Sequence, residues 1–198
     1  MDWSGLRGRL IVVSGASGSG KSTLLRHVLA RPEVRAGLSI SATTRSPRPG
    51  EEHGREYFFL TRSQFADLIA REELLEWAEV HGNLYGTPAL PVRDRLIEGW
   101  CVVLEIDVQG ALQVRSRVAG TCLIFIHPPS LEILEERLRR RSTEDEASIA
   151  NRMKNARWEM EQSHLYDHQL LNEDLDEAVE RLAEIFIQSG CGGRDEHA

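Results

Sequence analysis

The sequence predicts a three-layer α/β fold in which a parallel sheet between helices carries an inserted β-rich lobe. Short apolar runs rich in β-branched residues alternate with helical patterns near both ends of the chain, as buried parallel strands and their connecting helices do. The middle of the chain has short alternating runs separated by glycines, which indicates a second, smaller sheet. A length of 198 residues suits one domain with such an insertion.

The elements of the predicted core alternate in chain order. Apolar patterns predict strands at residues 10–14, 101–106 and 122–127, with a short strand near 170–171. Helical periodicity predicts helices at residues 21–30, 108–118, 131–140, 147–165 and 175–188. Each of the three longer strands is followed by a helical pattern, as parallel strands with helical crossovers require.

The predicted lobe lies between the first helix and the second core strand. Its short runs are residues 38–43, 56–60, 74–80 and 84–87. Thr61 and Gln64 form a capping-box pattern that starts one helix within it. The expected division is a core of about residues 1–35 and 95–190, a lobe of about 36–94 and a frayed tail of 191–198.

Charge and hydropathy exclude several classes of partner. The chain has 24 Lys+Arg against 31 Asp+Glu, a net charge of −7, which disfavours long-range attraction of nucleic acid. No apolar run approaches the roughly 18 residues that cross a bilayer, and the first nine residues lack a signal-peptide core. We therefore expect a cytoplasmic protein without a nucleic-acid or membrane partner.

The three cysteines are Cys101, Cys122 and Cys191, an odd number with no CxxC pair. This usage favours buried, reduced thiols over disulfides or metal ligands. The seven histidines show no metal-ligand spacing. We expect no metal site built by the protein alone.

A glycine-rich loop stands between the first predicted strand and the first predicted helix. Residues 15–22 fit the pattern GxxxxGK[ST] at every fixed position. Such a loop wraps a polyphosphate with inward N–H groups, and the helix start adds its positive end. The residues expected to bind are Gly15, Ala16, Ser17, Gly18, Ser19, Gly20, Lys21, Ser22 and Thr23. Lys21 would reach the terminal phosphates and Ser22 would coordinate Mg²⁺; a Ser/Gly-rich turn that matches by chance is the alternative.

Two acidic residues follow the end of the second core strand. Alternation along a strand sends Glu105 and Asp107 to the same side, at the carboxyl edge where open parallel sheets bind ligands. They would hold water around the nucleotide's metal ion. Two solvated acids at a strand end are the alternative.

The lobe carries residue types that suit a nucleoside monophosphate. Arg45 and Arg48 lie beside prolines that stiffen an extended loop, and guanidinium groups suit a phosphate monoester. The β-rich runs nearby add Tyr57, Glu76, Tyr85 and Thr87. A carboxylate accepts two hydrogen bonds from the N1–H and 2-amino group of guanine, a pair that adenine lacks. A solvated basic loop with scattered tyrosines is the alternative.

Four arginines crowd the end of the helix predicted at residues 131–140: Arg137, Arg139, Arg140 and Arg141. Cations at that position complement the helix dipole, which explains one or two of them. A mobile arginine-bearing flap would neutralise charge and exclude water during phosphoryl transfer. The spacing fits both interpretations.

Together these segments resemble the guanylate kinase family of P-loop nucleoside monophosphate kinases, which move a phosphoryl group from ATP to GMP. The resemblance covers nearly the whole chain and rests on the phosphate loop and on residues 39–54, 82–87, 104–110, 125–130 and 171–175. It implies a P-loop NTPase core with a GMP-binding lobe and a short helical lid at about residues 137–152. Ser142 departs from the family by standing where a glycine is usual, and residues 87–91 carry two prolines around a helix start.

The resemblance also implies a role for each matching residue. The GMP phosphate would be held by Arg45, Arg48, Tyr57 and Tyr85, and the guanine would be read by Ser41, Glu76, Thr87 and Asp107. The transferring phosphoryl group would be stabilised by Lys21, Arg45, Arg137, Arg141 and Arg152, and Asn172 would lie near the adenine.

The implied function is ATP-dependent phosphorylation of GMP, and of dGMP, to the diphosphate in purine nucleotide metabolism and GMP recycling. Mg²⁺ would come with ATP, and the protein would be a monomer or homodimer. The alternatives are a phosphokinase of a phosphorylated sugar on the same core and a non-catalytic binding module of guanylate kinase type. Glu76 beside the arginine loop argues against the first, and an intact Lys21 argues against the second.

Overall fold

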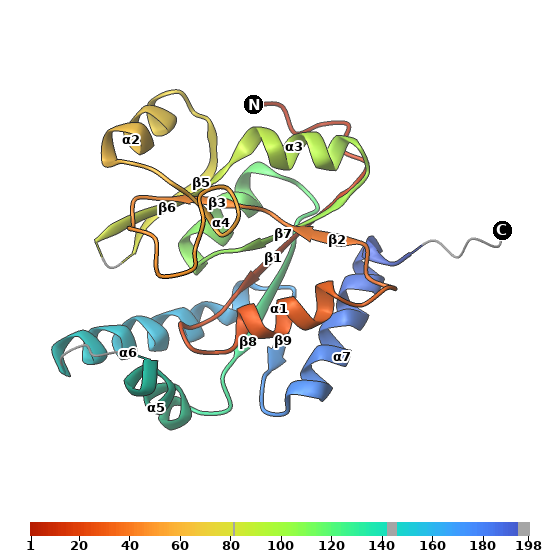
Figure 1. The fold of residues 1–198 in the computed structure, drawn as a ribbon. Helices are drawn as coiled ribbons and strands as arrows, with labels where there is room; N and C mark the ends of the chain where they lie inside the picture. The colour runs from red at the N-terminus through yellow and green to blue at the C-terminus, as the bar shows by residue number, and fades with distance from the viewer. Residues whose placement is uncertain (81, 142–145, 194–198) are drawn as a thin grey trace.

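The computed structural model describes residues 1–80, 82–141 and 146–193, without the side chain of Arg141 (Figure 1). Five parallel strands form its core sheet, in the order β2–β7–β1–β8–β9. Their bounds are β1 Arg9–Ser14, β2 Ala36–Leu38, β7 Cys101–Glu105, β8 Cys122–His127 and β9 His168–Leu171.

Helices cover both faces of this sheet, which confirms the three-layer α/β prediction (Figure 1). Helices α1 (Lys21–Leu29) and α7 (Leu175–Phe186) cover one face, and α3 (Ala89–Ile97) and α4 (Val108–Arg117) cover the other. Successive side chains of β1 point to opposite faces of the sheet, so Ile11 packs in the α1/α7 core and Val12 in the α3/α4 core. Helices α5 (Leu131–Arg141) and α6 (Glu146–Glu161) pack on each other through a smaller apolar cluster.

The lobe has its own four-stranded sheet, in the order β4–β3–β6–β5. Its elements are β3 Ser41–Thr43, β4 Tyr57–Phe59, α2 Arg62–Ala70, β5 Leu74–Val80 and β6 Asn83–Pro88. Thr61 and Gln64 form the predicted capping box at the start of α2. Phe65 of α2 is fully buried in the small core of the lobe.

The single strand predicted at residues 38–43 is two strands in two different sheets. Residues 36–38 pair with β7 in the core sheet, whereas residues 41–43 pair with β4 and β6 in the lobe. The prediction was wrong because apolar periodicity records burial and cannot show that the chain passes from one sheet to another. The lobe accordingly begins after Leu38 and not at residue 36.

Cys101 and Cys191 are buried, as expected, but the structure differs from the expected reduced thiols and from the expected frayed tail at residues 191–193. Cys101 and Cys191 form a disulfide, with their Cα atoms 5.5 Å apart, although 90 residues separate them in the sequence. Cys122 is the free thiol. Residues 191–193 do not fray, because the Arg35 amide donates to the Cys191 carbonyl (2.8 Å) and the Gly193 amide donates to the Glu33 carbonyl (2.9 Å).

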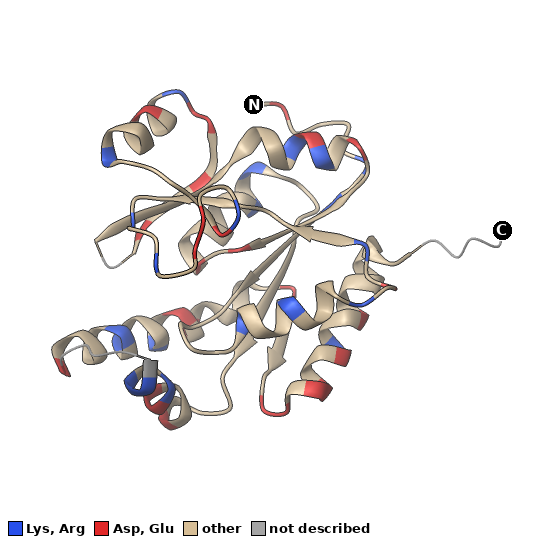
Figure 2. Cartoon of the chain, in the orientation of Figure 1, with Lys and Arg blue, Asp and Glu red and all other residues tan. Residues whose placement is uncertain are grey.

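The charged residues are distributed unevenly over this fold. In Figure 2 the Lys and Arg residues gather on α5 and α6 and in the lobe loop that follows β3. The outer face of α7 is mainly acidic (Figure 2). Other Lys and Arg residues lie on α1, α3 and α4 (Figure 2), in a chain whose net charge is −7. Within the described ranges, no helix is long and apolar enough to span a membrane.

Candidate active site

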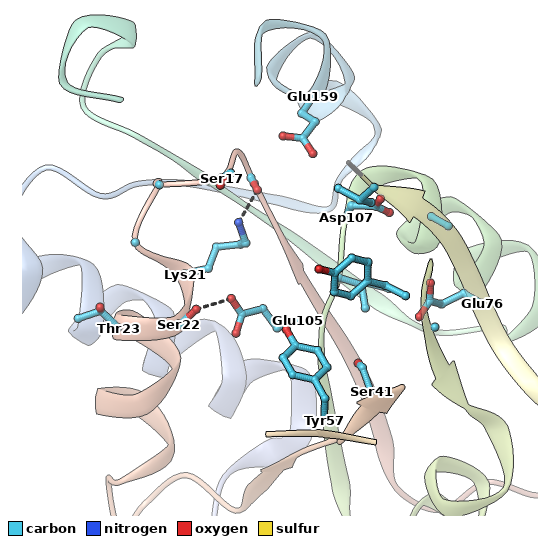
Figure 3. Close-up of a pocket in the computed structure, with 18 residues that line it drawn as sticks. Ser17, Lys21, Ser22, Thr23, Ser41, Tyr57, Glu76, Glu105, Asp107 and Glu159 are labelled. Atoms are coloured by element: carbon cyan, nitrogen blue, oxygen red, sulfur yellow. Dashed lines mark hydrogen bonds between the residues drawn. The ribbon is translucent and has the colours of Figure 1, made fainter. Parts of the chain in front are cut away.

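A cleft of about 350 Å³ opens where β1 and β7 end and the lobe sheet faces them. Its polar lining includes the predicted residues Ser17, Lys21, Ser22, Thr23, Ser41, Tyr57, Glu76, Tyr85, Glu105 and Asp107, and also Glu159. Figure 3 shows Lys21, Glu76 and Asp107 around the same space. A cleft at the carboxyl ends of parallel strands is where open α/β sheets bind ligands.

The phosphate loop has the backbone shape that its glycines permit. Gly18 and Gly20 take φ values of +96° and +95°, which other residues rarely adopt. A side chain at Gly20 would also collide with the Asn172 amide, whose Nδ2 donates to the Ser19 carbonyl at 2.7 Å. Asn172, 7% exposed, therefore holds the loop from the segment after β9.

Lys21 is the first residue of α1, directly after the loop. Its Nζ donates to the carbonyls of Gly15 and Ala16, the latter at 3.1 Å. The ammonium group is thereby kept inside the curve of the loop, on the side that lines the cleft. A cation in that place would meet the terminal phosphates of a nucleotide held by the loop.

Ser22 and Glu105 pair across the cleft floor. The Ser22 hydroxyl donates to Glu105 Oε1 at 2.6 Å (Figure 3). Because β7 lies beside β1 in the sheet, the end of β7 brings Glu105 next to the start of α1. A hydroxyl and a carboxylate side by side form an oxygen-donor set of the kind that Mg²⁺ prefers.

Glu76 is almost fully buried, with 3% of its surface exposed. Glu76 and Thr87 are paired residues on β5 and β6, and the Thr87 hydroxyl donates to Glu76 Oε1 at 2.6 Å. The pKa of Glu76 is raised to about 7: burial is the largest cause, the Thr87 hydrogen bond opposes it, and the negative charge of Asp107 adds to it.

Asp107 has a structural role that the sequence did not reveal. It is the N-cap of α4, and its Oδ1 accepts from the Gly110 amide at 2.8 Å. Burial is the main cause that raises its pKa. One carboxylate oxygen of Asp107 thus accepts a hydrogen bond from the start of α4, while the residue still lines the cleft opposite Lys21.

The pKa of Glu76 predicts a pH-dependent stability of the free protein. The native carboxyl binds a proton up to about pH 7, whereas the unfolded one releases it near 4.5, so stability falls as the pH rises through this window. As the pH rises from 4.5 to 8, the unfolding free energy of the parent should therefore fall by about 3 kcal/mol relative to that of Glu76→Gln, at about 1.4 kcal/mol per pH unit. Urea unfolding at several pH values measures the difference.

A control variant on the same strand isolates this effect. Glu79→Gln removes an exposed carboxylate of β5, and its stability should follow that of the parent at every pH. If the curves of Glu76→Gln and the parent run parallel from pH 5 to 8, the raised pKa of Glu76 is refuted.

Arg45 is held in an ion pair that sequence reasoning missed. Its two terminal nitrogens lie 3.0 Å from the two carboxylate oxygens of Glu51, and its guanidinium is 5.4 Å from the centre of the Tyr57 ring. The Glu51 hydrogen bond is the first cause that raises the pKa of Arg45. Glu51 also accepts from the Arg48 backbone amide at 2.7 Å, which shapes the turn.

The two tyrosines line the cleft, whereas neither Arg45 nor Arg48 does. The Tyr57 and Tyr85 rings meet edge to face with centroids 6.1 Å apart, and both line the cleft. Arg45 contacts the Tyr57 ring, and Arg48 is exposed. The structure thus brings Arg45 and both tyrosines together and leaves the Arg48 side chain on the surface.

Two of the predicted lid arginines reach the phosphate loop. Arg137 of α5 donates to the Gly18 carbonyl at 3.2 Å, and Arg152 of α6 donates to the Ser17 hydroxyl at 2.7 Å. Arg137 and Asn172 also line a second hollow beside Gly20 and Thr23. The Arg141 side chain and Ser142 lie outside the described residues.

Glu159 is a cleft residue that the sequence interpretation did not single out. It lies on α6 and points toward the cleft in Figure 3. Burial raises its pKa to about 7, opposed by the positive charge of Lys21. The signal was present, because Glu159 follows Arg152 by seven residues, which places both on one face of a helix.

Comparisons with known proteins agree with this geometry. The guanylate kinase family model matches residues 7–189. The chain is 47% identical over 185 residues to guanylate kinase of Synechocystis sp., covering 93% of this chain and 96% of that protein. It is 50% identical over 182 residues to guanylate kinase of Gloeobacter violaceus, covering 91% and 87%.

A solved structure gives the same result for the fold. The crystal structure of guanylate kinase from Anaplasma phagocytophilum matches with a TM-score of 0.75 and 33% identity, over 92% of this chain and 86% of that chain. The predicted resemblance and the P-loop NTPase fold are thereby confirmed. None of these matches favours the sugar phosphokinase or the binding module. The chain belongs to the guanylate kinase family, whose members are phosphotransferases that act as nucleoside monophosphate kinases.

Proposed function

We propose that this chain transfers the terminal phosphoryl group of ATP to the phosphate of GMP, and that each cleft residue contacts the part of the two nucleotides that lies nearest to it. The supporting observation is a buried, oriented carboxylate, Glu76, in the same cleft as the phosphate-loop Lys21. Glu76 would accept from the N1–H and 2-amino group of guanine. The proposal extends to dGMP, because the assigned residues address the base and the phosphate.

The two substrates would occupy the two sides of the cleft. The phosphate loop, with Asn172 behind it, would hold ATP. Ser41, Thr87 and Asp107 would complete the guanine site around Glu76. Arg45, Arg48, Tyr57 and Tyr85 would hold the GMP phosphate. Arg48 must turn inward from its exposed position to do so, which fits a lobe that closes on its substrate.

Phosphoryl transfer needs positioning and charge neutralisation more than covalent chemistry. An oxygen of the GMP phosphate attacks the γ-phosphorus of ATP, the bond from that phosphorus to the bridging oxygen breaks, and ADP leaves. Lys21, Arg45, Arg137, Arg141 and Arg152 would neutralise the negative charge that the two nucleotides bring together.

The residues present fit the Mg²⁺ that accompanies ATP. Ser22 would coordinate it, and Glu105 and Asp107 would hold it through water. Mg²⁺ bound there neutralises phosphate charge. Among the described residues, no cluster of three or more His, Cys, Asp or Glu side chains could hold a metal. Cytoplasmic location, the absence of nucleic-acid and membrane partners, and a monomeric or homodimeric state stay predictions.

The test is ADP release from MgATP by the purified protein with GMP, AMP, CMP, UMP or dTMP, and with Lys21→Ala as the blank. We expect rapid release with GMP alone. We also expect little ATP hydrolysis without an acceptor, because closure on GMP excludes water and completes the site. Equal ADP release with and without GMP, or a preference for another nucleotide, would contradict the proposal.

A further inference from the structure

Helix α4 of the core covers the free edge of the lobe sheet. β5 is an edge strand, so one row of its backbone groups has no strand partner. Gln113 of α4 satisfies both such groups of Trp77: its Nε2 donates to the Trp77 carbonyl at 2.7 Å, and its Oε1 accepts from the Trp77 amide at 3.2 Å. Arg117 donates to the carbonyls of Leu74 and Leu75. Figure 1 shows α4 beside β5.

Gly110 lies on the same face of α4 and is close to Glu76, the residue proposed to read the guanine. Residues 110, 113 and 117 are spaced i, i+3 and i+7, which places them on one face. A Cβ added at Gly110 would lie 2.5 Å from Glu76 Oε2 and 3.1 Å from its Cδ. Alanine is the better helix former, so close approach to Glu76 explains a glycine in this first turn.

The positions of both carboxylate oxygens of Glu76 are thus set by neighbouring residues. Thr87 donates to Oε1, and the bare backbone at Gly110 leaves room for Oε2. Gln113 fixes Trp77, the next residue along β5, and so fixes the register of β5 against α4. A carboxylate that must accept two parallel hydrogen bonds depends on such placement, because hydrogen-bond strength falls steeply with angle.

We propose that Gly110 and Gln113 are positioning residues for guanine selection, which act by setting the distance and register of α4 against β5 and so the orientation of the Glu76 carboxylate. This inference rests on the proposed role of Glu76. It explains how a residue of the lobe is placed against the phosphate-binding core: the contact runs through the helix that Asp107 caps.

The test compares GMP with IMP, which lacks the 2-amino group. Gly110→Ala should lower kcat/KM for GMP about tenfold, within the range for losing part of a bidentate base contact, and should reduce the preference for GMP over IMP. The KM for MgATP and the thermal unfolding midpoint should change little. Gln109→Ala, an exposed residue of the same helix turn, is the matched control and should leave all four quantities unchanged.

A double variant shows whether Gly110 acts through Glu76. In the Glu76→Gln background, Gly110→Ala should cost less than about twofold, because mutations that remove one shared interaction are not additive. An unchanged GMP-to-IMP preference in Gly110→Ala, or an equal loss in both backgrounds, would overturn the inference while leaving the proposed function intact. No effect of Glu76→Gln itself would overturn both.

Gln113→Ala keeps the test decisive if Gly110→Ala does not fold. This variant removes the two contacts to Trp77 without adding an atom. It should lower the GMP-to-IMP preference severalfold and leave the KM for MgATP unchanged. A variant that loses stability but keeps its full preference for GMP would show that α4 only supports β5.

Discussion

Replacing Lys21 with alanine should lower kcat by about 10²–10³-fold or more, the range found when one preorganised transition-state donor is removed. The ammonium is the charged group of the phosphate loop, and its contacts to the Gly15 and Ala16 carbonyls keep it on the cleft side. Charge builds up between the two nucleotides during transfer, so its loss should reduce kcat more than it raises the KM for GMP. Single-turnover ADP formation at saturating MgATP and GMP measures the effect.

The chain offers a matched control, because Lys154 is its second and last lysine. It is exposed on α6, and Lys154→Ala should keep full activity. Circular dichroism should show the same fold for both variants. A folded Lys21→Ala variant with more than about a tenth of the parent's kcat would exclude the proposed role of Lys21, since even one lost donor costs more.

The parts of the site that were predicted are those whose signal is local. Residues 15–22 carry the phosphate loop in one continuous pattern, and the strand and helix on either side were predicted within two residues of their observed bounds. Glu105 and Asp107 both line the cleft as predicted, but β7 ends at Glu105 and Asp107 caps α4, so strand alternation accounts only for the first of them. The structure brings most of the loop and both acids to one cleft, while Ala16 and Ser19 of the loop are buried beneath its surface.

The parts that were missed depend on contacts between distant segments. The disulfide joins Cys101 to Cys191, and nothing in the sequence indicates that the C-terminal segment returns to the start of β7. The role of Asn172 near the adenine stays a prediction, but its hydrogen bond to the Ser19 carbonyl, 153 residues away in the sequence, was not foreseen. The closeness of Gly110 to Glu76 depends on how a core helix packs on a lobe strand, which periodicity does not encode.

Glu51 shows a second kind of omission. In the sequence it was only one of residues 39–54 that carry the resemblance, and no role was assigned to it. The structure shows why it is there: it holds the Arg45 guanidinium with two contacts of 3.0 Å. A paired guanidinium keeps one orientation while the loop is open, which reduces the conformational entropy lost when a phosphate binds.

Glu76→Gln should lower kcat/KM for GMP by about 10–100-fold, since a good bidentate base contact discriminates by about 1–3 kcal/mol. The neutral amide would offer one acceptor and one donor where guanine presents two donors, so one hydrogen bond would be replaced by a clash of donors. The effect should fall on GMP, with the KM for MgATP unchanged, because Glu76 lies on the lobe side of the cleft. Steady-state kinetics with each substrate varied in turn separates the two.

Glu79→Gln serves again as the control, because it makes the same chemical change at an exposed position of β5. It should keep the parent's kcat/KM for GMP. IMP adds a second check: it presents only the N1–H to Glu76, so the loss with IMP should be smaller than the loss with GMP. An equal loss with both nucleotides would mean that Glu76 supports the lobe without reading the 2-amino group, and no loss with either would remove it from the site.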